Sequence, residues 1–189
     1  MNLDDDDLIE DFDFNDEEND DTGDDWKLKP LREAAAELKI LAKQILRTTE
    51  AIVETIPDKP EDHTEIDSLT ILQEYKGWMM ENAFKLQVKL SGAMATCNYI
   101  LMTENATIIK MAARDLMTQT SGLKMYGYEN QDYLDTLRTE IEDYRKVFVK
   151  WVRAFPKEEP LWPDGWGLYY TDEDVENWNK LNPDEQQQM

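Results

Sequence analysis

The stretch from residue 131 to residue 155 reads QDYLDTLRTEIEDYRKVFVKWVRAF, and its pattern of apolar residues decides the fold class. Large apolar side chains recur at alternating steps of three and four residues, at Leu134, Leu137, Ile141, Tyr144, Phe148, Trp151 and Phe155. With about 3.6 residues per turn, this spacing puts them all on one face of an α-helix. The residues between them are mostly charged or polar, so the stretch predicts an amphipathic helix that starts near Asn130 or Asp132 and ends at Pro156.

A second helix is predicted from about Pro30 to about Ile56. Proline suits the first turn of a helix, and Pro57 would end it. A seam of large apolar residues repeats every seven positions, at Leu31, Leu38, Ile45 and Ile52. A parallel seam of mostly smaller residues runs beside it, at Ala35, Ala42, Thr49 and Ile56. Because large and small side chains alternate, another helix can approach this one closely.

The middle of the chain carries two more apolar seams. One follows a capping-box-like sequence, Thr64 to Asp67, and contains Leu72, Tyr75, Met79, Asn82 and Leu86. The other contains Met102, Asn105, Ile109, Ala112 and Leu116. On one straight helix the two seams would be rotated by about 140° from each other. The chain must therefore change face between residues 89 and 101, and Ser91-Gly92 is the predicted break. One continuous helix of about 57 residues that changes partners midway is the alternative.

These segments predict an all-α fold, an antiparallel four-helix bundle over residues 26–155. Gly122 and Gly127 are expected to end the third helix. Residues 1–25 are expected to be a disordered acidic tail, because so charged a segment cannot bury enough apolar surface. Residues 156–189 are expected to form an aromatic-rich extension that packs on the bundle, contains a short helix after Thr171 and frays at its end. The alternative is that this extension forms a contact between two copies of the chain in a homo-oligomer.

Charge is unevenly distributed along the chain. Its 189 residues include 42 acidic and 20 basic ones, for a net charge of −22. Residues 1–25 hold 14 acids and no Lys or Arg, whereas residues 26–155 hold 19 acids and 18 bases. Phosphate binding depends on Lys and Arg, and no basic stripe of five or more residues stands out, so we expect no nucleic-acid binding. The same charge disfavours anionic membrane surfaces, and no uninterrupted apolar run of about 18 residues predicts a membrane span.

The scarcity of cysteine and histidine disfavours several other functions. It has one cysteine, Cys97, and one histidine, His63, so an internal disulfide, a zinc cluster and a His-dependent catalytic set are not expected. The acidic N-terminus is unlike a signal or transit peptide. The chain also lacks the Glu-x-x-His motif of di-metal helical bundles. We therefore expect a non-catalytic cytoplasmic protein without a cofactor or metal.

Two asparagines, Asn82 and Asn105, occupy seam positions in similar contexts, Glu-Asn-Ala. A buried amide must be hydrogen-bonded, and one seam asparagine commonly fixes helix register. The alternative is a polar pocket in the bundle core, lined by both asparagines, that supports a small-molecule- or metal-dependent activity.

The first 25 residues contain one grouped set of apolar side chains within the acidic run: Leu8, Ile9, Phe12 and Phe14. Acidic and hydrophobic residues that alternate in this way are typical of a linear motif that orders on a partner. The sequence therefore predicts an interaction or structural protein whose N-terminal segment docks in a basic, partly apolar groove of a protein partner. Two alternatives stay open: a segment that only keeps the protein in solution, and an inhibitor that mimics nucleic acid through its acidic ends.

Overall fold

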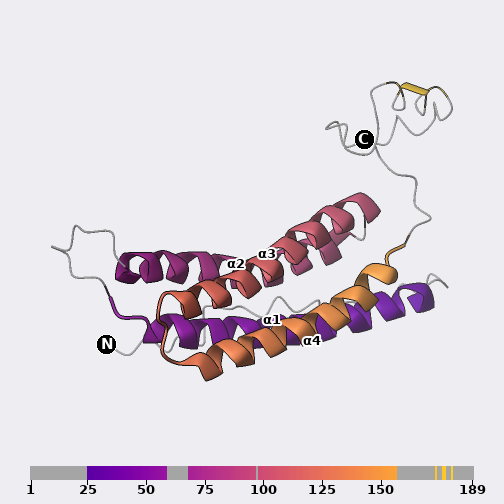
Figure 1. The fold of residues 1–189 in the computed structure, drawn as a ribbon. Helices are drawn as coiled ribbons and strands as arrows, with labels where there is room; N and C mark the ends of the chain where they lie inside the picture. The colour runs from indigo at the N-terminus through magenta and orange to yellow at the C-terminus, as the bar shows by residue number, and fades with distance from the viewer. Residues whose placement is uncertain are drawn as a thin grey trace, which may run out of the picture.

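The structure, a computed structural model, describes residues 25–58, 68–96 and 98–156, together with residues 173, 176, 177 and 180. It contains four α-helices: α1 (Asp25–Thr55), α2 (Ser68–Thr96), α3 (Tyr99–Met125) and α4 (Gln131–Arg153). Each helix runs antiparallel to the next (Figure 1), and no β-strand occurs in the described ranges. The predicted all-α, four-helix fold is therefore confirmed.

The expectations for residues 1–24 and for the capping box at Thr64 lie outside the described residues. The same holds for most of the C-terminal extension. Within its predicted short helix, four residues are described, and all are helical: Glu173, Glu176, Asn177 and Lys180.

The helices pack as two antiparallel pairs around one core. The α2–α3 pair lies against the α1–α4 pair (Figure 1), and α3 and α4 share the smallest interface among the four neighbouring pairs. Both predicted seams of α1 are buried throughout. On α2 and α3 the fully buried seam residues include Met79, Leu86, Ile109 and Leu116. The core is thus almost entirely apolar, as in a bundle stabilised mainly by removing apolar surface from water.

Helix α4 buries the predicted face with one difference. Val147 is 4% exposed, whereas Phe148 beside it is only half-buried. The last turn carries Trp151, which is fully buried and lies edge-on to Phe155 with ring centroids 4.7 Å apart. Phe155 also packs edge-on against Tyr99 at the start of α3, at 6.5 Å. These aromatic contacts fix the end of α4 against the α2–α3 turn.

Helix α1 begins five residues before the predicted start at Pro30, at Asp25. Pro30 has no N–H to donate to the carbonyl of Trp26, the residue four positions earlier. Trp26 is 69% exposed, so water can reach this end of the helix and compensate for the missing hydrogen bond. The proline therefore lies one turn inside the helix and does not mark its first residue.

The predicted break at Ser91-Gly92 is wrong, because both residues lie inside α2. The chain turns between Thr96 and Tyr99, within the range over which the seams change face, so one continuous helix is also excluded. Asn98 is the N-cap of α3, and its Oδ1 accepts hydrogen bonds from the backbone N–H groups of Ile100 and Leu101 at 3.0 and 3.1 Å. This side chain satisfies two otherwise unpaired donors, which is why the break falls here.

Gly127 ends α3 as predicted, with a φ of +86° that favours glycine, and Tyr128 closes the turn by donating its N–H to the carbonyl of Leu123 at 3.0 Å. Gly122 does not end the helix; it lies within α3. A Cβ at this position would lie 2.6 Å from Cζ of Tyr75 on α2. Gly122 therefore provides the space in which the Tyr75 ring crosses between the helices.

Candidate functional site

The structure places Asn82 and Asn105 apart. Asn82 is buried in α2 at 7% exposure. Asn105 is half-buried in α3, where its Nδ2 donates to the carbonyl of Leu101 at 2.8 Å and its Oδ1 faces Gly92. Gly92 lies ten residues beyond Asn82 along α2, or about 15 Å at 1.5 Å per residue. The two amides therefore do not face a common space, and the hydrogen bond of Asn105 is made within its own helix.

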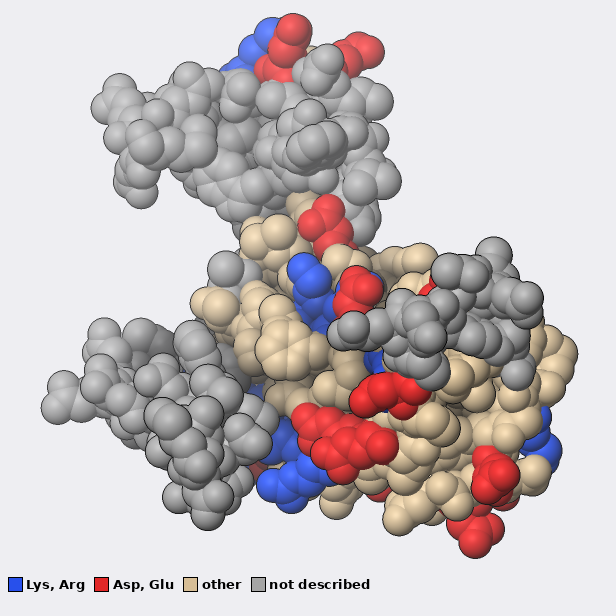
Figure 2. All heavy atoms as spheres, turned by 90° about the vertical axis from the view of Figure 1, so that its left-hand side faces the viewer, with Lys and Arg blue, Asp and Glu red and all other residues tan. Residues whose placement is uncertain are grey.

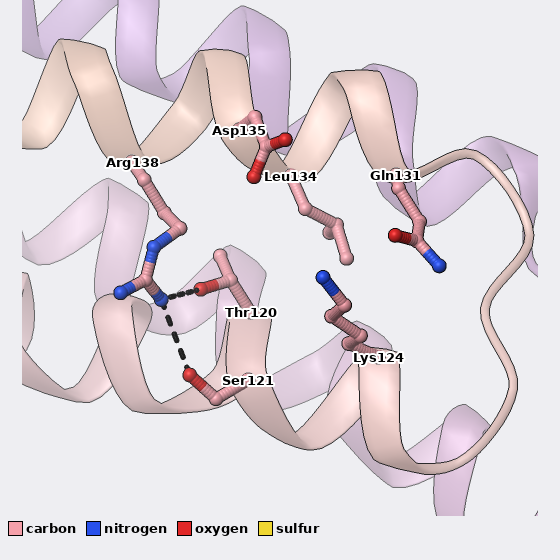
Figure 3. A pocket seen from close by; sticks show the side chains of 7 residues that line it. All are labelled: Thr120, Ser121, Lys124, Gln131, Leu134, Asp135 and Arg138. Atoms are coloured by element: carbon pink, nitrogen blue, oxygen red, sulfur yellow. Dashed lines mark hydrogen bonds between the residues drawn. The ribbon is translucent and has the colours of Figure 1, made fainter.

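A groove of about 330 Å³ lies between the end of α3 and the start of α4. Figure 3 shows that side chains of both helices point into it. Its lining is formed by Thr120, Ser121, Lys124, Gln131, Leu134, Asp135 and Arg138. The groove opens where the interface between neighbouring helices is smallest.

Arg138 ties the two walls of this groove together. Its Nη1 donates to Oγ1 of Thr120 at 2.8 Å, to Oγ of Ser121 at 3.1 Å and to the carbonyl of Met117 at 3.1 Å. A cation near the C-terminal end of α3 also interacts favourably with the helix dipole. Ligand pockets are mostly apolar, whereas Leu134 is the one large apolar side chain in this lining. The groove is therefore better explained as a helix–helix contact than as a ligand site.

A second polar feature lies between α1 and α4. Thr48 donates to Oε1 of Glu140 at 3.0 Å, while Oε2 of Glu140 is buried without a hydrogen-bond partner. Burial raises the pKa of Glu140, and the Thr48 hydrogen bond partly offsets this rise. One turn further along α4, the hydroxyl of Tyr144 is also buried without a partner, and burial raises its pKa. Neither side chain lines the α3–α4 groove. Buried polar atoms without a hydrogen-bond partner reduce stability.

The helices do not share the acidity of the whole chain. Together α1 to α4 hold 17 of the 20 bases but only 14 of the 42 acids, so their net charge is +3. The remaining residues hold 28 acids and three bases, and 13 of those acids lie in residues 1–24. On the bundle end shown in Figure 2, acidic and basic side chains are interspersed among other residues.

A basic stripe runs along the outward face of α1. A search of the sequence for consecutive basic residues does not find it. Its residues follow steps of three and four, and all are at least partly exposed: Lys29, Arg32, Ala36, Ile40, Lys43 and Arg47. We call these six residues the α1 stripe. Residues 26–47 hold six bases and two acids, so this part of α1 has a net charge of +4. The helical spacing of the cations is the signal in the sequence that identifies the stripe.

The centre of the α1 stripe is apolar. The side chain of Ile40 is 61% exposed, and Ala36 is one turn away from it. Arg32 and Lys43 flank these two residues along the helix. The ammonium of Lys29 makes only a loose ion pair with Glu33, at 3.9 Å. The stripe therefore offers a small apolar centre between cations, which suits an acidic peptide that contains large apolar side chains.

Other predicted site residues lie where the structure gives no geometry. Leu8, Ile9, Phe12 and Phe14 are outside the described residues. Within the described ranges, no group of three or more His, Cys, Asp or Glu residues could hold a metal ion. Among the described helices, none combines the length and the apolar character needed to cross a bilayer. Comparisons with protein-family models, with curated proteins and with solved structures find no match.

Proposed function

We propose that this chain is a non-catalytic cytoplasmic interaction protein. In this proposal the bundle is a rigid platform, and the acidic-hydrophobic segment of residues 8–14 binds a protein partner with a basic, partly apolar groove. Leu8, Ile9, Phe12 and Phe14 are the apolar anchors. The surrounding acids accelerate the encounter with a basic surface.

The separation of charge between the helices and the rest of the chain is the observation that supports this proposal. An acidic segment that served only to keep the protein in solution would need no large apolar residues, yet four of them are grouped within residues 8–14. The described core around Asn82 is packed with apolar side chains, and the α3–α4 groove has the contacts of a helix interface. A binding role for the segment outside the bundle is therefore favoured over chemistry inside it.

The test compares three full-length proteins in capture from lysate of the source cells, followed by mass spectrometry. One is the unchanged chain, one carries Phe12→Ala and Phe14→Ala, and one has residues 15–24 in scrambled order with the same charge. We expect the unchanged and scrambled proteins to retain the same partner and the double variant to lose it. The retained protein is then purified and titrated with the three chains by calorimetry.

Equal binding by all three proteins would contradict the proposal, because Phe12 and Phe14 would then contribute nothing to it. Binding that a short DNA duplex competes away would instead favour a nucleic-acid mimic. A partner that binds the double variant as well as the unchanged chain would move the binding surface to the bundle or to residues 156–189. Light scattering of the purified chain would show whether that surface joins two copies.

A further inference from the structure

We propose that the α1 stripe is an internal docking surface for the acidic-hydrophobic segment, residues 8–14, of the same chain. In this arrangement the segment covers Ile40 and the cations around it, and a partner with a basic groove must compete with α1 for the segment. The inference goes beyond the proposed partner and does not depend on it, because the contact forms within one molecule.

The chemistry of the two surfaces is complementary. The segment reads Leu8-Ile9-Glu10-Asp11-Phe12-Asp13-Phe14, with three carboxylates between four large apolar residues. The α1 stripe has four cations around an apolar centre, and the side chain of Ile40 is 61% exposed. Carboxylates can pair with the cations while the phenylalanine rings cover Ile40 and the methylene stems of the basic side chains.

The chain is long enough to make this contact. Phe14 precedes Asp25 by 11 residues, which span at most about 36 Å when fully extended. Ile40 lies 15 residues into α1 from Asp25, or about 22 Å along its axis. A connection of this length also keeps the segment at an effective concentration on the order of millimolar, so a weak contact is sufficient.

Exposed apolar residues at the centres of α2 and α3 have fewer cations around them than Ile40 has on α1. On the outward faces of α2 and α3, Phe84 and Met111 are 55% and 59% exposed. Acidic residues accompany them: Glu81 lies one turn before Phe84, and Asp115 lies one turn after Met111. Lys85 adjoins Phe84 and Arg114 follows Met111 by one turn, so these faces carry charges of both signs; on α1 one acid, Glu37, likewise lies one turn before Ile40. The preference for α1 rests on charge, because residues 26–47 carry a net charge of +4, whereas α2 and α3 carry +1 each.

The test measures the distance between the segment and α1 in the full-length chain. Cys97→Ser removes the native cysteine. Asn15→Cys and Gln44→Cys then carry nitroxide spin labels, and pulsed electron–electron double resonance measures the distance between them. Residue 15 follows the segment directly, and Gln44 is an exposed residue of α1 one turn from Ile40. We expect a short, narrow distance distribution at low salt that broadens as salt screens the charges.

Two charge-reversal variants separate the stripe from general electrostatics. Lys43→Glu with Arg47→Glu reverses two exposed or half-exposed cations one turn apart in α1. Lys110→Glu with Arg114→Glu makes the same change at two exposed positions with the same spacing in α3. We expect the α1 pair to abolish the short distance and the α3 pair to retain it. Circular dichroism checks that both variants keep their helices.

Three results would overturn the proposal: a broad distribution in the unchanged chain, the same loss from both reversal pairs, or no loss from either. A short distance that disappears when labelled protein is mixed with excess unlabelled protein would also overturn it, because the contact would then join two copies. The measurement contains no partner, so its failure would leave the partner proposal to be judged by the capture experiment alone.

Discussion

Gly122 and Gly77 are two helical glycines with opposite surroundings, and they predict opposite effects of the same substitution. A Cβ at Gly122 would lie 2.6 Å from Cζ and 2.9 Å from Cε1 of Tyr75. The Tyr75 ring is held by Trp78 and Tyr126, with centroids 5.6 and 6.2 Å away, so it cannot move freely. A Cβ at Gly77 would have nothing within 4 Å apart from its chain neighbours and its own helix backbone.

We therefore expect Gly122→Ala to lower the free energy of unfolding by about 1–3 kcal/mol, the usual cost of overpacking. Gly77→Ala should raise it by about 0.5–1 kcal/mol, because alanine has the better helix propensity. Urea denaturation of both variants measures the difference. A Gly122→Ala variant as stable as Gly77→Ala would show that the Tyr75 ring does not cross α3 at this point.

The half-buried Glu140 predicts a pH-dependent effect. Its pKa is raised in the folded protein, so its protonated form is favoured there, and the folded state loses stability as the pH rises through that pKa. Glu140→Gln can keep the hydrogen bond from Thr48 without the buried charge. We expect it to be stabilising at neutral pH, by less than about 1 kcal/mol because the group is partly solvated.

The advantage of Glu140→Gln should disappear on acidification, when the wild-type carboxyl becomes neutral. Denaturation at neutral and at acidic pH measures it. The control is Glu142→Gln, which removes a surface ion pair with Arg145 of 2.8 Å and should give no such gain. A gain from Glu140→Gln that increases with acidity would contradict the sign of the pKa shift.

At the scale of single elements, the N-cap of α3 decides where the long helical stretch breaks. Asn98→Ala removes the acceptor for two backbone N–H groups, so we expect a loss of about 1 kcal/mol in unfolding free energy. Asn98→Asp keeps an acceptor oxygen and adds a favourable charge at the helix N-terminus, so it should restore most of the loss. Guanidinium denaturation of the two variants is the measurement. Equal stability of both would mean that the break is set by packing alone.

The existence of each helix was predictable because apolar spacing reports directly on burial. The seams of α1 and α4 run through the core as expected, except that Val147 is buried more fully than Phe148. The ends were less predictable, because they depend on individual hydrogen bonds and close contacts. Gly92 and Gly122 resemble helix breaks in sequence, yet each lies inside a helix and faces a side chain of the neighbouring helix.

The candidate sites were less predictable than the helices. Asn82 and Asn105 share a sequence pattern, but antiparallel packing of α2 on α3 separates them along the bundle. The α1 stripe is absent from any count of consecutive charges, because its neighbouring cations are three, eleven and four positions apart. It becomes visible when the helical period is applied to charge as it is to hydrophobicity.

At the scale of the whole molecule, the acidic segment should hide the basic face of the bundle from polyanions. Without residues 1–24 the net charge changes from −22 to −9, and the α1 stripe remains. We expect the full-length protein to pass through a heparin column at low salt and the shortened chain to be retained. Adding Lys43→Glu and Arg47→Glu to the shortened chain should abolish retention. Retention of the full-length chain would show that the segment leaves the stripe uncovered.

In the proposed arrangement residues 8–14 dock on the α1 stripe of the same chain and do not serve only to keep the protein in solution. The most direct measurement is a comparison of amide ¹H–¹⁵N spectra of the full-length chain with and without Phe12→Ala and Phe14→Ala, at low salt. Both substitutions leave the charge unchanged, so general electrostatics stay the same. We expect shift changes in α1 between Lys29 and Arg47. Spectra that differ only within the first 24 residues would contradict docking on α1.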